Sequence, residues 1–215
     1  MTVQHCVALV LALLKYNVSL TALAIAIALP ISCVCALLRI SRLRWISYPM
    51  RWYVNILRSM PLMLVMFWIY IMVPMLTTAS VSAYWSALIA LACFEVAYFT
   101  EFIRSGIQSV SAHQWSAGVA NGMSRFQTAR HVILPQALRR MTPALLTQSL
   151  VAFQDSTISS VIGVPEILQE TTVANAQGQS TVFYYTFLAV IFFVICYLAS
   201  RAVKAMDKRY QLSRG

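Results

Sequence analysis

The sequence predicts an all-α membrane protein with five transmembrane helices, on the basis of its composition, its uncharged blocks and the placement of its basic residues. Hydrophobic residues make up 60% of the 215 residues and charged residues only 10%, whereas a soluble domain carries roughly 25% charged residues. So few charges cannot cover a water-soluble fold. Residues 16–38, 59–94 and 171–200 contain no charged side chain. Each block can cross a bilayer, which takes about 20 mainly apolar residues.

The basic residues predict the orientation of these helices. The net charge is +10, from 16 Lys and Arg against 6 Asp and Glu, an excess that in a soluble protein would indicate nucleic-acid binding. However, all of the basic residues except Lys15 fall within 39–58, 104–140 and 201–214. By the positive-inside rule these three segments are cytoplasmic. We therefore predict an amino terminus outside, a carboxyl terminus in the cytoplasm, and no nucleic-acid partner.

An outside amino terminus and an inside carboxyl terminus require an odd number of spans. Residues 1–215 are expected to form one membrane domain, with residues 1–14 as an interfacial or outer-surface helix that leads into the first span. Pro30 predicts a kink in that span, which neighbouring helices in a membrane can tolerate. The connections expected are a short basic loop at 39–51, a tight outer turn at 77–82 and an outer loop at 166–181. The spans are expected at about 17–38, 57–75, 84–103, 137–164 and 182–200.

A helical hairpin is predicted at 112–134, within the longest cytoplasmic segment. Residues 111–114 (SAHQ) and 124–127 (SRFQ) each match a capping box, in which a serine hydroxyl and a glutamine side chain satisfy free backbone amides at a helix start. Gly122 supplies the left-handed residue expected between the two helices. Pro135 is expected to end the second helix.

Enzyme chemistry finds no support in the sequence. His5, His113 and His131 are far apart, and the chain contains no zinc-protease, nucleophile-elbow or phosphate-loop motif. Its five cysteines form no pair or cluster with metal-ligand spacing. We therefore predict no catalytic residue, no metal site and no cofactor bound by this chain, so that energy for uphill transport would have to come from a partner.

Two acidic residues fall deep within predicted spans, where a charge costs roughly 2.5–3.5 kcal/mol. Glu95 lies about 13 Å along the helix from Arg104, and Asp155 lies about 22 Å from Arg140. Both fit a polar translocation pathway, although a protonated, hydrogen-bonded core acid is the alternative. The candidate pathway residues are Glu95, Asp155, Ser156 and Thr157.

Four residues near the cytoplasmic surface are structural or gating candidates. Glu101 and Arg104 have the i, i+3 spacing of a helical ion pair. Arg58 and Pro61 open the second span. Two interpretations of Arg58 stay open, because its side chain can extend to lipid phosphate groups or can contact a partner subunit.

The hairpin segment also carries a spaced motif. Three residues separate 116–118 (SAG) from Gly122, and nine residues separate Gly122 from 132–135 (VILP). On this spacing the chain resembles the permease subunits of bacterial ATP-binding-cassette (ABC) importers, whose loop follows E-A-A-x3-G-x9-I-x-L-P. Ser116 and Gly118 depart from the glutamate and the second alanine. Segments 53–61, 94–109 and 153–157 are similar to the polar amino-acid branch, the histidine/glutamine permease family, and most of all to glutamate/aspartate permeases.

The resemblance implies a type I ABC importer permease-like fold in the bacterial cytoplasmic (inner) membrane. The hairpin would be a coupling helix that docks on an ABC ATPase subunit, present in two copies, which binds the ATP and Mg²⁺. A second permease subunit, either a sister chain or another copy, and an external solute-binding protein would complete the system, in contact with membrane lipid. The coupling residues implied are Ser116, Ala117, Gly118, Gly122, Arg125, Leu134 and Pro135.

The function predicted is that of a non-catalytic permease subunit of an importer for polar amino acids, with glutamate and aspartate as the preferred cargo. Two acids on the pathway would instead favour a neutral or cationic cargo, so glutamine or a basic amino acid is the alternative. A stand-alone secondary carrier or channel that uses Glu95 and Asp155 is a further alternative. The absent motifs disfavour a membrane enzyme.

Overall fold

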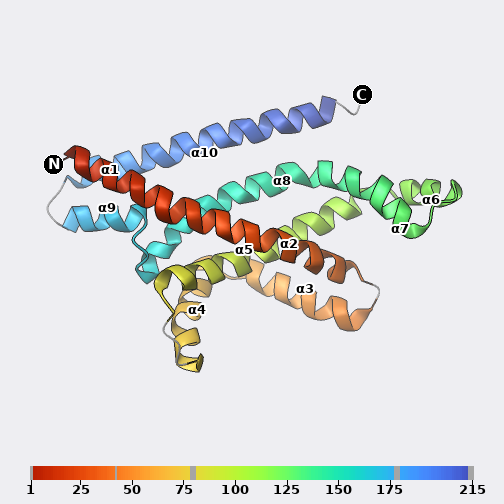
Figure 1. The fold of residues 1–215 in the computed structure, drawn as a ribbon, viewed down its shortest axis with the longest axis horizontal. Helices are drawn as coiled ribbons and strands as arrows, with labels where there is room; N and C mark the ends of the chain where they lie inside the picture. Colours follow the sequence, from red (N-terminus) through yellow and green to blue (C-terminus); the bar gives the residue numbers. More distant parts are fainter. Residues whose placement is uncertain (1, 42, 78–80, 177–179, 213–215) are drawn as a thin grey trace.

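The computed structural model describes residues 2–41, 43–77, 81–176 and 180–212, and every regular element in these ranges is helical. The prediction of an all-α fold is therefore confirmed (Figure 1). The elements, with π or 3-10 turns labelled η, are α1 (Thr2–Ala12), η1 (Leu13–Val18), α2 (Ser19–Ile40), α3 (Arg44–Ser59), α4 (Leu62–Thr77), α5 (Ala83–Gln108), α6 (Ala112–Ala120), α7 (Arg125–Thr128), η2 (Ala129–Ile133), α8 (Leu134–Asp155), η3 (Ser156–Ile162), α9 (Ile167–Ala176) and α10 (Thr181–Leu212).

The amino-terminal segment forms one long helix. α1, η1 and α2 follow one another without a break (Figure 1), and 37 of their residues, Gln4–Ile40, pass the length and hydropathy test for a membrane span. At 1.5 Å per residue they extend about 55 Å, well beyond the roughly 30 Å of a hydrocarbon core. A helix before the first span was expected, but its continuity with that span was not. α2 also continues through Pro30.

The expected basic loop at 39–51 is wrong, because α3 occupies most of it. The arginines at 44, 51 and 58 recur every seven residues and share one helix face, while Val54 is buried and Trp45 is exposed. Such periodicity indicates an amphipathic helix. The Tyr53 hydroxyl donates to the Cys93 carbonyl of α5 at 2.7 Å. Pro61 ends α3 because it disfavours helical geometry in the residue before it, and α4 departs at 108°.

α5 is the central helix and packs against α2, α3, α4 and α8. Small residues allow α2 and α5 to approach closely, as is usual between membrane helices. Ala24 and Ala28 on α2 and Ala87 and Ala90 on α5 are all completely buried. The predicted third span, 84–103, corresponds to this helix, which extends five residues further to Gln108.

The carboxyl-terminal half differs from expectation in one connection. The predicted fourth span, 137–164, corresponds to α8 followed by the 3-10 segment η3, which ends at Ile162. The expected outer loop at 166–181 contains the helix α9. α10 covers the predicted fifth span and continues to Leu212. Among the described residues, three helices are long and apolar enough to cross a membrane, and the bent pair α3–α4 makes up to four. The count of five spans stays a prediction, as does the tight turn at 77–82, of which residues 78–80 lie outside the described residues.

Candidate functional site

The hairpin lies at one end of the helical bundle, and α9 lies at the other (Figure 1). Gly122 has a φ of 79°, so the left-handed residue expected between α6 and α7 is confirmed. The second capping box is also confirmed. The backbone N–H of Gln127 donates to Ser124 Oγ at 3.2 Å, and the backbone N–H of Ser124 donates to Gln127 Oε1 at 2.8 Å. The first box is wrong: Ser111 precedes α6 but makes no side-chain cap bond.

Pro135 does not end the second helix of the hairpin. The chain passes from α7 through the π turn η2 directly into α8, and Pro135 lies in the first turn of α8. Proline has no N–H to donate to the preceding turn, and it follows directly on the π turn η2, where the α-helical hydrogen-bond pattern is already altered. The hairpin is therefore joined to α8 by continuous helical backbone, and a displacement of α7 reaches the bundle without an intervening loop.

Gly118 sets how closely the two hairpin helices pack. A Cβ added at this position would overlap Cγ2 and Oγ1 of Thr128, far inside van der Waals contact. Thr128 is completely buried, and its hydroxyl donates to the Ser124 carbonyl at 3.0 Å. The departure of Gly118 from the alanine of the family motif thus has a physical reason, since threonine occupies the space that an alanine methyl would need.

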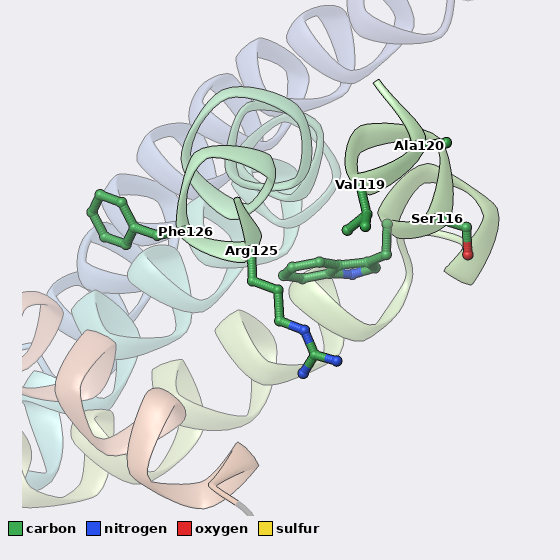
Figure 2. Close-up of a pocket in the computed structure, with 6 residues that line it drawn as sticks. Ser116, Val119, Ala120, Arg125 and Phe126 are labelled. Atoms are coloured by element: carbon green, nitrogen blue, oxygen red, sulfur yellow. The ribbon is translucent and has the colours of Figure 1, made fainter. Parts of the chain in front are cut away.

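A pocket of about 870 Å³ lies on the hairpin. Phe126 and Val119 on its wall are largely exposed, at 72% and 51%. Figure 2 shows Ser116, Val119 and Ala120 on α6. Arg125 and Phe126 project from the start of α7 in different directions, with the Phe126 ring pointing away from the Arg125 side chain. Exposed apolar groups beside a cation suit a protein partner that offers an apolar side chain and a carboxylate. The pocket is lined by Trp115, Ser116, Val119, Ala120, Arg125 and Phe126.

The predicted coupling residues occupy different places around this pocket. Ser116 and Arg125 line it, whereas Gly118 is buried behind it. Leu134 instead lines a second, apolar pocket between the hairpin and the end of α2. The structure therefore divides the motif residues into a surface and its support. Ala117, Gly122 and Pro135 are exposed outside the first pocket.

An ionic cluster joins three helices near the hairpin end of the bundle. The predicted pair between Glu101 and Arg104 is confirmed. Arg39 of α2 also pairs with Glu101, and Arg58 of α3 lies 3.9 Å from Glu101 Oε2. The Arg58 guanidinium additionally lies over the Tyr98 ring at 5.2 Å. Arg39 and Arg58 were missed as partners because they are 62 and 43 residues from Glu101, whereas Arg104 is on the same helix.

The candidate pathway residues lie where α5 meets α8. Glu95 is completely buried, and Gln148 Nε2 of α8 donates to its Oε1 at 3.1 Å. Among the described residues, Glu95 Oε2 has no hydrogen-bond partner. Asp155 is partly exposed at the junction of α8 and η3. Gln148 is a site residue that sequence reasoning missed.

The residues after Asp155 divide between the interior and the surface. Ser156 is completely buried and accepts a hydrogen bond from Asn17 Nδ2 at 3.0 Å. Thr157 donates to the Gln154 carbonyl at 2.7 Å and stays partly exposed. Throughout the described ranges, no three His, Cys, Asp or Glu side chains are grouped so that they could hold a metal ion.

The chain is similar in sequence and in fold to known transport proteins. The model of the family described as "binding-protein-dependent transport system inner membrane component" matches residues 9–212. The glutamate/aspartate import permease protein GltK of Escherichia coli O6:H1 is 34% identical over 203 residues, which cover 91% of each chain. The probable glutamine ABC transporter permease protein GlnP of Bacillus subtilis is 32% identical, over 73% of this chain and 72% of that protein. A solved amino acid ABC transporter with histidines superposes with a TM-score of 0.86 at 28% identity, covering 94% of this chain and 96% of the other.

Proposed function

Because the chain belongs to the family of binding-protein-dependent transport system inner membrane components, we propose that it is the permease subunit of an ABC importer whose cargo is glutamate and aspartate. The observation that carries the cargo assignment is the 34% identity with GltK over 91% of both chains. ATP hydrolysis belongs to a separate ATPase subunit, and an external binding protein delivers the amino acid.

The α6–α7 hairpin is the docking element for the ATPase. The support for this role is its exposed apolar and basic pocket, together with the helical continuity from α7 through η2 into α8. When the ATPase subunits close on nucleotide, the hairpin is displaced and α8 moves with it. Rigid-body motion of packed elements is a common form of such transitions. Two ATPase copies act on two permease subunits, of which this chain is one.

The cargo pathway opens at the contact between α5 and α8, where Asp155 is partly exposed and Glu95 and Gln148 are buried. A dicarboxylic cargo next to two acids is acceptable only if the acids are protonated or hydrogen-bonded, and Gln148 already donates to Glu95. The same acids favour a second cargo class, glutamine or a basic amino acid. The hairpin faces the cytoplasm and α9 faces outward. The basic segment 104–140 contains the hairpin, and the basic residues within 201–209 on α10 lie toward the same end of the bundle (Figure 1).

The test is reconstitution of the permease with its ATPase and binding protein in liposomes, followed by uptake of labelled glutamate. We expect uptake to require ATP on the side of the membrane that carries the ATPase subunit. We also expect excess aspartate to inhibit glutamate uptake more strongly than glutamine or arginine does. Stronger inhibition by arginine would reassign the cargo. Uptake without the ATPase, driven by a proton gradient, would refute the importer assignment in favour of a stand-alone carrier.

A further inference from the structure

A buried polar cluster lies at the end of the bundle opposite the hairpin, and it consists of Asn17, Ser156 and Glu166. Each of the three residues is 0% exposed. They come from three separate parts of the chain: Asn17 from the π turn η1, Ser156 from the start of η3, and Glu166 from the residue before α9. Asn17 is 139 residues from Ser156 and 149 from Glu166.

The hydrogen bonds of this cluster leave no polar atom of the Asn17 and Glu166 side chains without a partner. Asn17 Nδ2 donates to Ser156 Oγ at 3.0 Å and to Glu166 Oε2 at 2.9 Å. Asn17 Oδ1 accepts from the Ile167 amide at 3.3 Å, and Glu166 Oε1 accepts from the Gln169 amide at 2.9 Å. Since a carboxylate offers only acceptors, Asn17 must turn its amide nitrogen toward it.

Separation of any one segment from the others would leave buried polar groups unsatisfied. A buried donor or acceptor that loses its partner carries the full desolvation penalty, and the penalty is larger for a charged group. Pulling η1 away from α9 would strip Glu166 Oε2 of its donor and the Ile167 amide of its acceptor at once. The three segments therefore separate only at high cost, and they move together at little cost.

The cluster is also joined to the hairpin by continuous helical backbone. α7, η2, α8 and η3 follow one another without an intervening loop, and Ser156 is the first residue of η3 (Figure 1). A displacement of the hairpin consequently reaches Ser156 along α8. From there, Asn17 and Glu166 are the polar connection to the long amino-terminal helix and to α9.

We propose that Asn17 and Glu166 are positioning residues for transport, which make η3, α9 and the amino-terminal helix one unit that follows α8 when the ATPase displaces the hairpin. The proposal rests on the importer function proposed above. It adds that the far end of the permease is driven through this cluster. Loss of the cluster should uncouple the subunit, so that ATP is still hydrolysed but less cargo crosses per ATP.

The test compares variants in the complete complex of permease, ATPase and binding protein in liposomes, with glutamate uptake and ATPase rate measured together. Asn17→Asp faces one carboxylate with another, and we expect uptake per ATP to fall by at least about tenfold. In the double variant Asn17→Asp with Glu166→Gln, the new glutamine amide can donate to the new aspartate. We expect this swap to restore uptake per ATP to within about threefold of the parent. Asn175→Asp, the same substitution on α9 outside the cluster, is the matched control.

Glu166→Gln alone is a milder variant, in case Asn17→Asp does not fold. The glutamine has one oxygen where the carboxylate has two, so either Asn17 Nδ2 or the Gln169 backbone amide loses its acceptor. We expect uptake per ATP to fall by up to about tenfold while the complex stays folded, as its melting temperature reports. Unchanged uptake per ATP in a folded Glu166→Gln complex would overturn the proposal. So would a folded swap variant that stays uncoupled. If instead the parent complex itself takes up no glutamate, the proposed function has failed, and that result is read from the parent alone.

Discussion

The substitution Gly118→Ala tests whether the closed hairpin is the element that binds the ATPase. The added methyl would overlap Thr128 Cγ2 and Oγ1, and overpacking of this kind costs about 1–3 kcal/mol. Alanine regains up to about 1 kcal/mol through its higher helix propensity. A Cβ less than 3.0 Å from both Cγ2 and Oγ1 of Thr128 belongs in the upper part of that overpacking range, about 2–3 kcal/mol. The expected net cost is therefore about 1–2 kcal/mol for keeping α6 against α7, which corresponds to a factor of about 5–30 in an equilibrium. ATPase binding should weaken by that factor.

The assay is equilibrium binding of the purified ATPase subunit to the permease in nanodiscs, with the melting temperature as a check on folding. Thr128→Ala removes both overlapping atoms, although Thr128 Cβ still lies 3.0 Å from the added methyl. The double variant Gly118→Ala with Thr128→Ala should therefore regain most of the lost affinity. It forgoes only the hydrogen bond from Thr128 to the Ser124 carbonyl, about 0.5–1.5 kcal/mol.

Gly122→Ala is the matched control for this pair. It adds the same methyl in open space, but at a φ of 79°, where a side chain costs about 1–2 kcal/mol. Thr128→Ala should not rescue it, because the strain has a different cause. Parental ATPase binding by Gly118→Ala would refute the reasoning, as would lost binding that Thr128→Ala fails to restore.

Three further predictions concern the interior of the bundle. Glu101→Gln leaves three arginines without their carboxylate and should lower stability by about 1–3 kcal/mol in detergent thermal unfolding, whereas the control Glu170→Gln should not; equal melting temperatures would contradict the ionic cluster. Gln148→Leu removes the donor to Glu95 and should reduce uptake while ATPase binding persists; parental uptake would remove Gln148 from the pathway. Burial raises the pKa of Glu166 above its usual value even though Asn17 and two backbone amides oppose the shift. The folded state therefore binds more protons, so stability should fall as pH rises from the ordinary glutamate range, and this slope should be absent in Glu166→Gln.

Hydropathy and local motifs predicted the parts of the fold that local sequence determines. The uncharged blocks contain most of α2, all of α4 with the first part of α5, and the first part of α10. The serine at 124 caps α7 as its spacing indicated. α3 was missed because its arginines were counted as loop signals, although their seven-residue spacing places them on one helix face. The change from α-helix to 3-10 helix at Ser156 and the helix α9 had no comparably strong signal.

In the candidate site, too, contacts within one helix could be predicted from the sequence and contacts between distant segments could not. Glu101 and Arg104 were paired correctly because they are one helical turn apart. Arg39 and Arg58 reach the same carboxylate from other helices, and Asn17 meets Glu166 across 149 residues. Such contacts depend on how the helices pack, which a single sequence does not specify. Gly118 illustrates the same limit, since its reason lies in Thr128 on the neighbouring helix.

The most direct test of the account is glutamate uptake into liposomes that contain the permease with, and without, the ATPase subunit. We predict uptake against a concentration gradient only when the ATPase, ATP and the binding protein are all present, and slower uptake at limiting ATPase in the hairpin variant Gly118→Ala, which binds the ATPase more weakly. Uptake of equal rate in liposomes that lack the ATPase, sustained by a proton gradient alone, would contradict the central claim that this chain is driven through its hairpin.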